Sequence, residues 1–224
     1  MKQIFLVFIM LLIFCFVANA LEPAGTITKI IGEPKLKSTT GDWKTATKGK
    51  MVYDGDQLQT GANSKIEIVF VDGTALRLNR NSNFTITQTA KLKAGYATKT
   101  RLDNGQLWFN RPKGPGQLNL ETPVAVAAVK GTQGDLQVGN NGDTTLIVLD
   151  GQVEFSSALV AVLVNELQRA IATQKTPPVV DSIKKENLPT WQKELAIEPA
   201  SKKVTIDYRD GGQTGQIILN YKKK

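Results

Sequence analysis

Four aspartates carry the acid–base chemistry that remains open to this chain. The sequence has no histidine and one cysteine, Cys15. This composition excludes Ser-His-Asp and Cys-His nucleophiles and every Cys/His zinc site. A pair of carboxylates acting on a glycosidic bond is the chemistry left, and its candidates are Asp54, Asp56, Asp103 and Asp150. Each of them lies in a turn sequence rich in Gly or Asn, which explains it structurally, so we expect a binding module and treat a glycan-active enzyme as the alternative.

A metal or cofactor site is not indicated either. Asp54 and Asp56 could bind calcium, but neither the EF-hand spacing nor a glycine-rich nonapeptide is present. We therefore expect no cofactor and no metal.

Lys130 is the one lysine in an otherwise apolar run, TPVAVAAVKGT. We interpret it as structural, with its ammonium group bonded to backbone carbonyls or to a carboxylate such as Asp150. Ligand binding by Lys130 is the alternative. The run itself is expected to be extended after its Thr-Pro start, with valines 124 and 126 on one side and alanines 125 and 127 on the other. Ala128-Val129 would interrupt this alternation as a bulge, and Gly131 would allow a close turn.

The elements that position these residues are short strands. Residues 24–155 alternate apolar and polar side chains between Asp-Gly and Asn-Gly turns, which predicts an all-β domain. Gly73, Gly105 and Gly151 each follow Asp or Asn and precede a short apolar stretch. The sequence fits stacked strands in a β-solenoid or roll, and it fits a sandwich with three similar hairpins nearly as well.

The ends of the chain have their own patterns. Residues 1–20 have the basic start, apolar run and Ala-Asn-Ala site of a secretory signal peptide cleaved after Ala20, which predicts a periplasmic or secreted protein without a transmembrane span. The hydrophobic periodicity of residues 157–174 fits a helix and a strand about equally well. A linker and short helix are expected at 176–198, with the helix over 189–195, followed by a β-hairpin at 199–224 that must dock on something.

The net charge of +8 favours anionic partners. We do not expect nucleic acid, because the lysines form no stripe interleaved with aromatic residues. The closing residues 222–224 are three lysines, which could make peripheral contact with an anionic membrane surface or polysaccharide. The tryptophans Trp43 and Trp108 are expected in the core or covering a layer.

Two groups of residues resemble the FecR-type periplasmic domain, and the resemblance spans 24–178. The first group is Trp43, Gly49, Gly55, Asp56, Thr60, Gly61, Asp72 and Gly73, and the second is Thr122, Pro123, Lys130, Gly131, Thr132, Asp150 and Gly151. The resemblance implies a FecR-type β domain over 21–175. It also implies that 157–174 is strand, with Leu167 where the family usually has a turn glycine.

In that family the domain receives a signal from an outer-membrane transporter and passes it through a membrane helix to a sigma-factor regulator. This chain shows neither the cytoplasmic segment nor an internal spanning helix. We therefore expect a stand-alone, exported recognition or scaffolding module that binds a protein partner or an envelope polysaccharide, with a role in signal sensing as one version of this.

Overall fold

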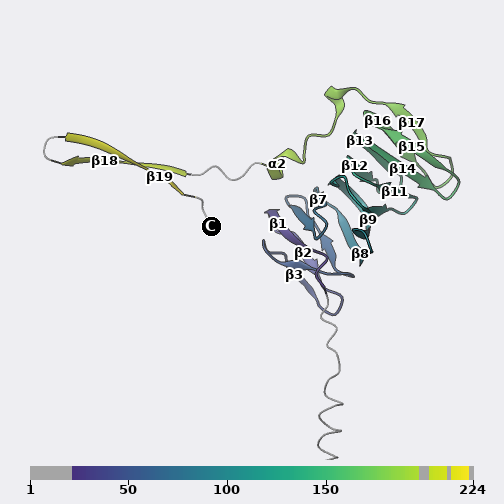
Figure 1. Ribbon diagram of the computed structural model, residues 1–224, viewed down its shortest axis with the longest axis horizontal. Helices are drawn as coiled ribbons and strands as arrows, with labels where there is room; N and C mark the ends of the chain where they lie inside the picture. The colour runs from purple at the N-terminus through teal and green to yellow at the C-terminus, as the bar shows by residue number, and fades with distance from the viewer. Residues whose placement is uncertain (1–21, 197–201, 211–212, 222–224) are drawn as a thin grey trace, which may run out of the picture.

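The computed structural model describes residues 22–196, 202–210 and 213–221. Its main feature is a continuous sheet of 17 strands, rolled into two layers (Figure 1). Layer A contains, in spatial order, β4 (Met51–Val52), β1 (Gly25–Ile31), β6 (Lys65–Phe70), β7 (Ala75–Leu78), the end of β9 (Tyr96–Asn110), β12 (Gln133–Val138), β13 (Thr144–Asp150), β16 (Gln168–Ala172) and β17 (Val179–Ser182). Layer B contains β3 (Trp43–Thr45), β2 (Lys35–Lys37), β5 (Gln57–Gln59), β8 (Asn83–Lys91), the start of β9, β10 (Gly116–Glu121), β11 (Ala125–Val129), β14 (Gln152–Ser157) and β15 (Ala161–Asn165).

The remaining elements follow the roll in sequence. They are the 3₁₀ turn η1 (Lys185–Asn187), the helix α2 (Lys193–Ala196) and a hairpin of β18 (Lys202–Asp210) and β19 (Gln213–Tyr221). The all-β prediction is confirmed, and the rolled, sandwich-like alternative describes the arrangement. None of the helices in the described ranges is long and apolar enough to cross a membrane. The expected signal peptide at 1–20 and the lysines at 222–224 lie outside the described residues.

Strand β9 joins the two layers. Its first half pairs with β8 and β10 in layer B, and its second half pairs with β7 and β12 in layer A. Gly105 lies at the crossing with φ +99°, and a Cβ on it would be 2.5 Å from the Cα of Ser82. Only glycine fits this backbone conformation and this close approach. Gly73 forms the hairpin turn between β6 and β7, whereas Gly151 forms a corner from layer A to layer B, so the interpretation of three similar hairpins is wrong.

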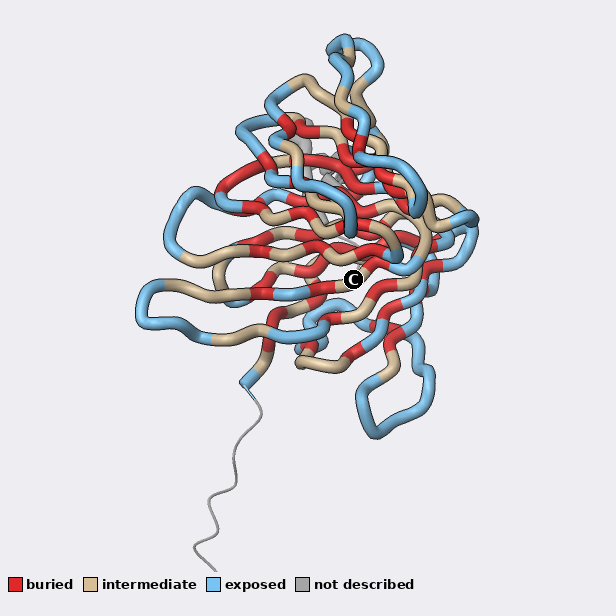
Figure 2. Tube along the Cα trace, turned by 90° about the vertical axis from the view of Figure 1, so that its right-hand side faces the viewer, coloured by how far each residue is buried: buried red, intermediate tan, exposed pale blue. Residues whose placement is uncertain are grey.

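A single apolar core fills the space between the layers. Strand alternation directs one side of each strand inward, and the buried residues of both layers form one cluster. Figure 2 shows the buried segments through the middle of the roll, with exposed turns on both sides. Representative members are Ile66, Ile68, Leu107 and Phe109 from layer A and Leu118, Leu120, Val153 and Phe155 from layer B. Each such side chain contributes about 1.5–3 kcal/mol by its burial.

Strand β11 corrects one expectation and confirms another. Ala125, Ala127 and Val129 face the core, while the residues between them are half-buried, so the predicted two sides are confirmed. The pairing of β11 with β10 and with β14 has no register shift, so the predicted bulge at Ala128-Val129 is wrong. The alternation continues because Val129 points inward. Ala127 lies opposite Phe155, and its small side chain leaves room for that ring.

The buried cation of this region is Arg111 and not Lys130. Arg111 is 4% exposed, and its Nη1 donates to the Asp72 carboxylate and to Thr74 Oγ1 at 3.1 Å. Its Nη2 donates to the carbonyl oxygen of Pro115 at 3.1 Å. Lys130 is exposed, and no ion pair within the described ranges includes it, so the expected contact with Asp150 is not present there. The reason is the alternation: Val129 faces inward, so the next residue faces solvent.

The segment 157–174 consists of strands, as the resemblance implied. β15 and β16 are joined at Leu167, which has φ +59°, the left-handed conformation that glycine usually adopts. Residues 179–182 of the expected linker belong to β17, so the sheet extends beyond the predicted end of the β domain at 175, and the short helix begins at Lys193, four residues later than expected. The terminal hairpin is present as predicted, with its expected turn at 211–212 outside the described residues.

Replacement of Arg111 by Met should lower the free energy of unfolding by about 3 kcal/mol, because it leaves the Asp72 carboxylate buried without its partner. Lys130→Met is the matched control and should change it by less than about 0.5 kcal/mol. Urea unfolding of both variants measures these free energies. Equal decreases in the two variants would contradict Arg111 as the buried, structural cation.

Leu167→Gly should be more stable than Leu167→Ala by about 1 kcal/mol, since both lose the side chain and only alanine keeps the strained φ. Thermal melts of the two variants decide this. An alanine variant as stable as the glycine variant would mean that the turn carries no strain.

Candidate functional site

A row of side chains crosses the outer face of layer A. Direct cross-strand pairing aligns, from β1 to β17, Lys29, Glu67, Arg77, Trp108, Asp135, Ile147, Arg169 and Asp181, which we term the outer row. Neighbours in such a row lie close enough for their side chains to interact. Trp108 is buried but lies outside the core cluster, while Leu107 and Phe109 on either side of it belong to the core. The row is therefore a second, polar packing layer.

The first part of the row is an ion-pair network around Glu67. Its carboxylate accepts from Arg77 Nε at 2.6 Å and from Thr28 Oγ1 at 2.7 Å, and it lies 3.5 Å from Lys29 Nζ. Burial raises the pKa of Glu67, but these hydrogen bonds and charges outweigh it and the net pKa is lowered. The Arg77 guanidinium also lies 4.4 Å from the centre of the Trp108 ring, a cation–π contact.

Asp135 has a different environment. It is 2% exposed, and its two oxygens accept from Gln106 Nε2 at 2.9 Å and from Trp191 Nε1 at 2.8 Å. Both donors are neutral, so they compensate burial only in part. Burial raises the pKa of Asp135 to about 6, against the lowering effect of the two hydrogen bonds.

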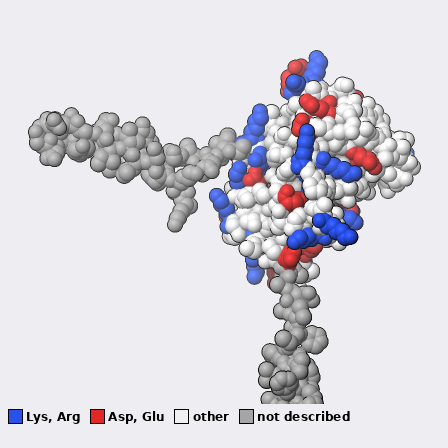
Figure 3. All heavy atoms as spheres, in the orientation of Figure 1, with Lys and Arg blue, Asp and Glu red and all other residues white. Residues whose placement is uncertain are grey.

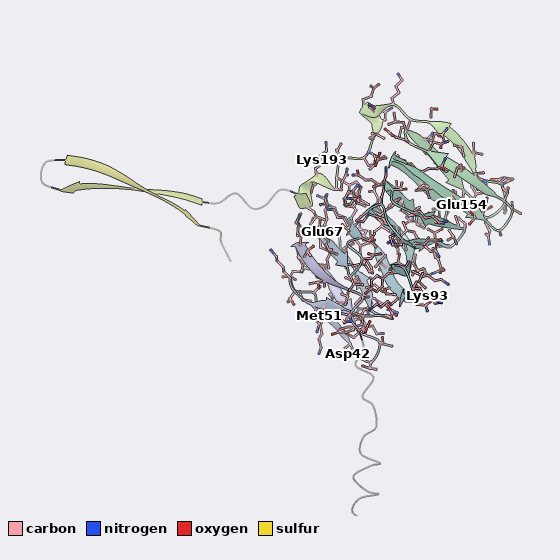
Figure 4. All side chains as sticks on the ribbon, in the orientation of Figure 1. Asp42, Met51, Glu67, Lys93, Glu154 and Lys193 are labelled. Carbon is pink, nitrogen blue, oxygen red and sulfur yellow. The ribbon has the colours of Figure 1, made fainter. Side chains whose placement is uncertain are left out.

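Residues 191–195, which we term the C-terminal cover, lie on this part of the row. Besides the Trp191 bond, the backbone oxygen of Gln192 accepts from Arg77 Nη1 at 2.9 Å. Glu194 pairs with Lys65 Nζ at 2.6 Å, and Lys65 lies 5.7 Å from the Trp191 ring centre. Lys65 and Leu195 are each 2% exposed. Figure 4 shows Glu67 on the roll close to α2 and its Lys193.

A polar pocket opens at the edge of the roll where the chain passes between β5 and β6 and between β7 and β8. Its volume is about 430 Å³, and it is lined by Glu33, Lys35, Gln59, Thr60, Gly61, Asn81, Asn83 and Asn104. Asn83 Nδ2 donates to Asn104 Oδ1 at 2.5 Å, and Asn104 Nδ2 donates to the backbone oxygen of Asn81 at 2.8 Å. Amide groups both donate and accept, so this lining can bind a hydroxyl-rich ligand.

The far end of the roll is apolar. β15 and β17 are the last strands of their layers within the described ranges. Exposed apolar side chains gather on these strands and the turn before β15: Leu159, Val160, Leu163 and Val179. We term these four residues the apolar end. Elsewhere, on the face drawn in Figure 3, acidic and basic side chains are interspersed.

The candidate catalytic aspartates lie in three parts of the fold and have contacts typical of turns and of a surface ion pair. Asp54 and Asp56 lie in the turn between β4 and β5, where Asp56 accepts from the backbone N–H of Tyr53 at 3.0 Å. Asp103 in β9 pairs with Arg101 at 2.7 Å, and Asp150 ends β13 as an exposed residue. Within the described ranges, no group of three or more acidic, His or Cys residues could hold a metal ion.

The residues of the FecR resemblance lie mostly at the turns along the two edges of the roll. Gly49, Gly55, Asp56, Thr60, Gly61, Asp72 and Gly73 lie in connections before β7, and Thr122, Pro123, Lys130, Gly131, Thr132 and Gly151 lie in those between β10 and β14. Trp43 lies in β3, and Asp150 is the last residue of β13. Thr60 Oγ1 accepts from the N–H of Ser82 at 2.9 Å, and Thr132 Oγ1 donates to the Gln152 oxygen at 2.9 Å. These bonds join successive turns, which is a structural role. Only Thr60 and Gly61 also line the pocket.

The predictions for Trp43 and Trp108 have different outcomes. Trp108 covers the outer face of layer A as expected, whereas Trp43 is 41% exposed, so its expected burial is wrong. Sequence reasoning missed Lys65, Asp135 and Trp191, because polar residues at outward strand positions are typical of a solvated face. The sequence carries no signal that marks Asp135, because its burial between the buried Gly134 and Leu136 is seen only in the folded chain.

The pKa of Asp135 predicts a pH-dependent stability. The folded chain holds the proton more tightly than the unfolded chain, so this group's stabilising contribution is complete below about pH 3.8 and is lost as the pH rises through about 6. The two values imply a change of about 3 kcal/mol over this range. Asp135→Asn should remove this component, as measured by urea unfolding of both proteins at pH 4.5, 6 and 7.5. A difference in the free energy of unfolding between the two proteins that stays constant over the three pH values would contradict the raised pKa of Asp135.

Comparison with known proteins shows what the roll is similar to. The sequence model of the FecR protein family matches residues 56–154. The fold is similar to two crystal structures, at 1.65 and 2.50 Å resolution, of a protein from Parabacteroides distasonis ATCC 8503 described as a candidate anti-sigma factor; each has a TM-score of 0.51 and 12% identity and covers 58% of this chain and 61% of the other. This chain thus spans about three-fifths of their length, and no curated protein sequence matches it. Residues 56–154 of the rolled β domain are thus similar to the FecR protein family.

Proposed function

We propose that this chain is a non-catalytic recognition module of the bacterial envelope that binds a protein partner by strand addition at the apolar end. The observation that supports this most is that both layers finish there on strands without a further neighbour in the described ranges, beside four exposed apolar side chains. The signal-peptide pattern at 1–20 supports a periplasmic or secreted location.

Edge strands expose backbone N–H and C=O groups in a row, and an extended partner segment can pair with them. Proteins usually protect such edges with charge, and here β17 carries one ion pair, Arg169 with Asp181. β15 has none, and Leu163 on it is 53% exposed. A partner segment with alternating apolar residues fits this edge, since it would pair with β15 and cover Leu163.

The test is binding of the purified chain to envelope fractions from its own source. A Leu163→Lys, Val179→Lys variant should lose at least about tenfold in affinity, because two charges enter the interface. Met51→Lys is the matched control, since Met51 is equally exposed at the opposite end of the roll, and it should bind normally. Protease treatment of the fraction should abolish binding, and glycan-degrading treatment should not. Binding that survives proteolysis would contradict a protein partner.

The polar pocket favours a second candidate, an envelope polysaccharide. Four amide side chains and one residue of each charge line a volume that could hold a sugar unit, and no apolar side chain contributes. In the same assay, Asn83→Ala with Asn104→Ala should then reduce binding, and glycan degradation should abolish it. Peripheral contact of residues 222–224 with an anionic membrane surface remains a prediction from the sequence.

A further inference from the structure

We propose that the outer face of β6, β7, β9 and β12 is a receptor for a segment with the pattern Trp-x-x-Glu, and that residues 191–194 of this chain occupy it as an internal competitor. A partner segment with an indole and a carboxylate at this spacing would displace the cover. This inference does not depend on strand addition at the apolar end.

The first support is that the receptor groups belong to the roll and converge on one short segment. Asp135 receives the indole N–H, Lys65 receives the carboxylate of Glu194, and Arg77 receives the backbone oxygen of Gln192. Lys65 and Asp135 are each 2% exposed, and the cover gives Lys65 a carboxylate partner and gives Asp135 an indole donor. The segment that satisfies them follows the domain matched at 56–154 and contributes no strand to it.

The second support is that the cover fits incompletely. The indole N–H of Trp108 and the side-chain oxygen of Gln192 are buried in this region without a hydrogen-bond partner. Asp135 also loses hydration here with only neutral donors in return. Unpaired buried polar groups cost free energy, so a segment that offers an acceptor to Trp108 would bind better than the chain's own residues do.

The third support is that the cover can leave without breaking the sheet. α2 has four residues, which is too short to be stable on its own. The backbone bonds of Lys193 and Glu194 return to Thr190 and Trp191 within the same segment. Displacement therefore costs the side-chain contacts described above and leaves the β-ladder of the roll intact.

The test uses a fluorescent peptide with the sequence of residues 188–196, LPTWQKELA, and the full-length chain. In fluorescence anisotropy, Trp191→Ala should bind the peptide at least about tenfold more tightly than the unchanged chain, whose own segment competes at high effective concentration. Trp43→Ala, which removes an exposed tryptophan elsewhere, is the matched control and should behave as the unchanged chain. A peptide with alanine in place of its tryptophan should not bind.

Further variants test the receptor face and the competition by residues 191–194 independently. Asp135→Ala added to Trp191→Ala should abolish peptide binding, while thermal melts confirm that the chain remains folded. Glu194→Lys opens the cover through a half-exposed side chain and serves as a second open variant should Trp191→Ala not fold. Absence of peptide binding by a folded open variant would overturn the receptor, and equal binding by the unchanged and open chains would overturn the competition. The peptide assay contains no β15 edge ligand, so its failure leaves the proposed function untouched.

Discussion

The crossing of β9 from one layer to the other is the constraint on which the rest of this structure depends. A strand that pairs in both layers fixes their separation and register, and Gly105 permits the crossing because nothing larger fits beside Ser82. The alternation of β9 then decides what each face receives. Leu107 and Phe109 enter the core, and Trp108 is directed to the outer face, where it becomes the centre of the outer row. One strand thus connects the apolar core with the polar surface that the cover occupies.

The outer row shows how one sheet face can contain two electrostatic environments. The Glu67 carboxylate lies beside Arg77 and Lys29. These cations and the hydrogen bonds lower the pKa of Glu67 by more than burial raises it. Three strands further on, Asp135 accepts only from amide and indole donors, and the effect of burial on its pKa prevails. A buried ion pair such as Arg111 with Asp72 instead joins two groups of opposite charge. Under the cover, the unpaired indole N–H of Trp108 and a buried carboxylate with only neutral donors lie on one face, which makes that surface suited to exchange of one segment for another.

The sequence was sufficient for the all-β class and for the two-sided pattern of β11, because alternation and turn chemistry are local. The strands on either side of Leu167 followed only from the family resemblance. It was insufficient where long-range packing decides. Lys130 looked buried among apolar neighbours, yet the alternation turns it outward, and Arg111 holds the buried position instead. Asp135, Lys65 and Trp191 are up to 126 positions apart in the printed sequence, and only the folded sheet brings them together.

The central claim is that Trp191 donates its indole N–H to a buried Asp135 whose pKa lies near 6. The most direct measurement is a pH titration of the Trp191 indole resonance in ¹⁵N-labelled protein by NMR. The account predicts a chemical-shift inflection at about pH 6 that disappears in Asp135→Asn. An inflection near pH 4, or a resonance that matches free indole throughout, would contradict the docked cover and with it the proposed receptor.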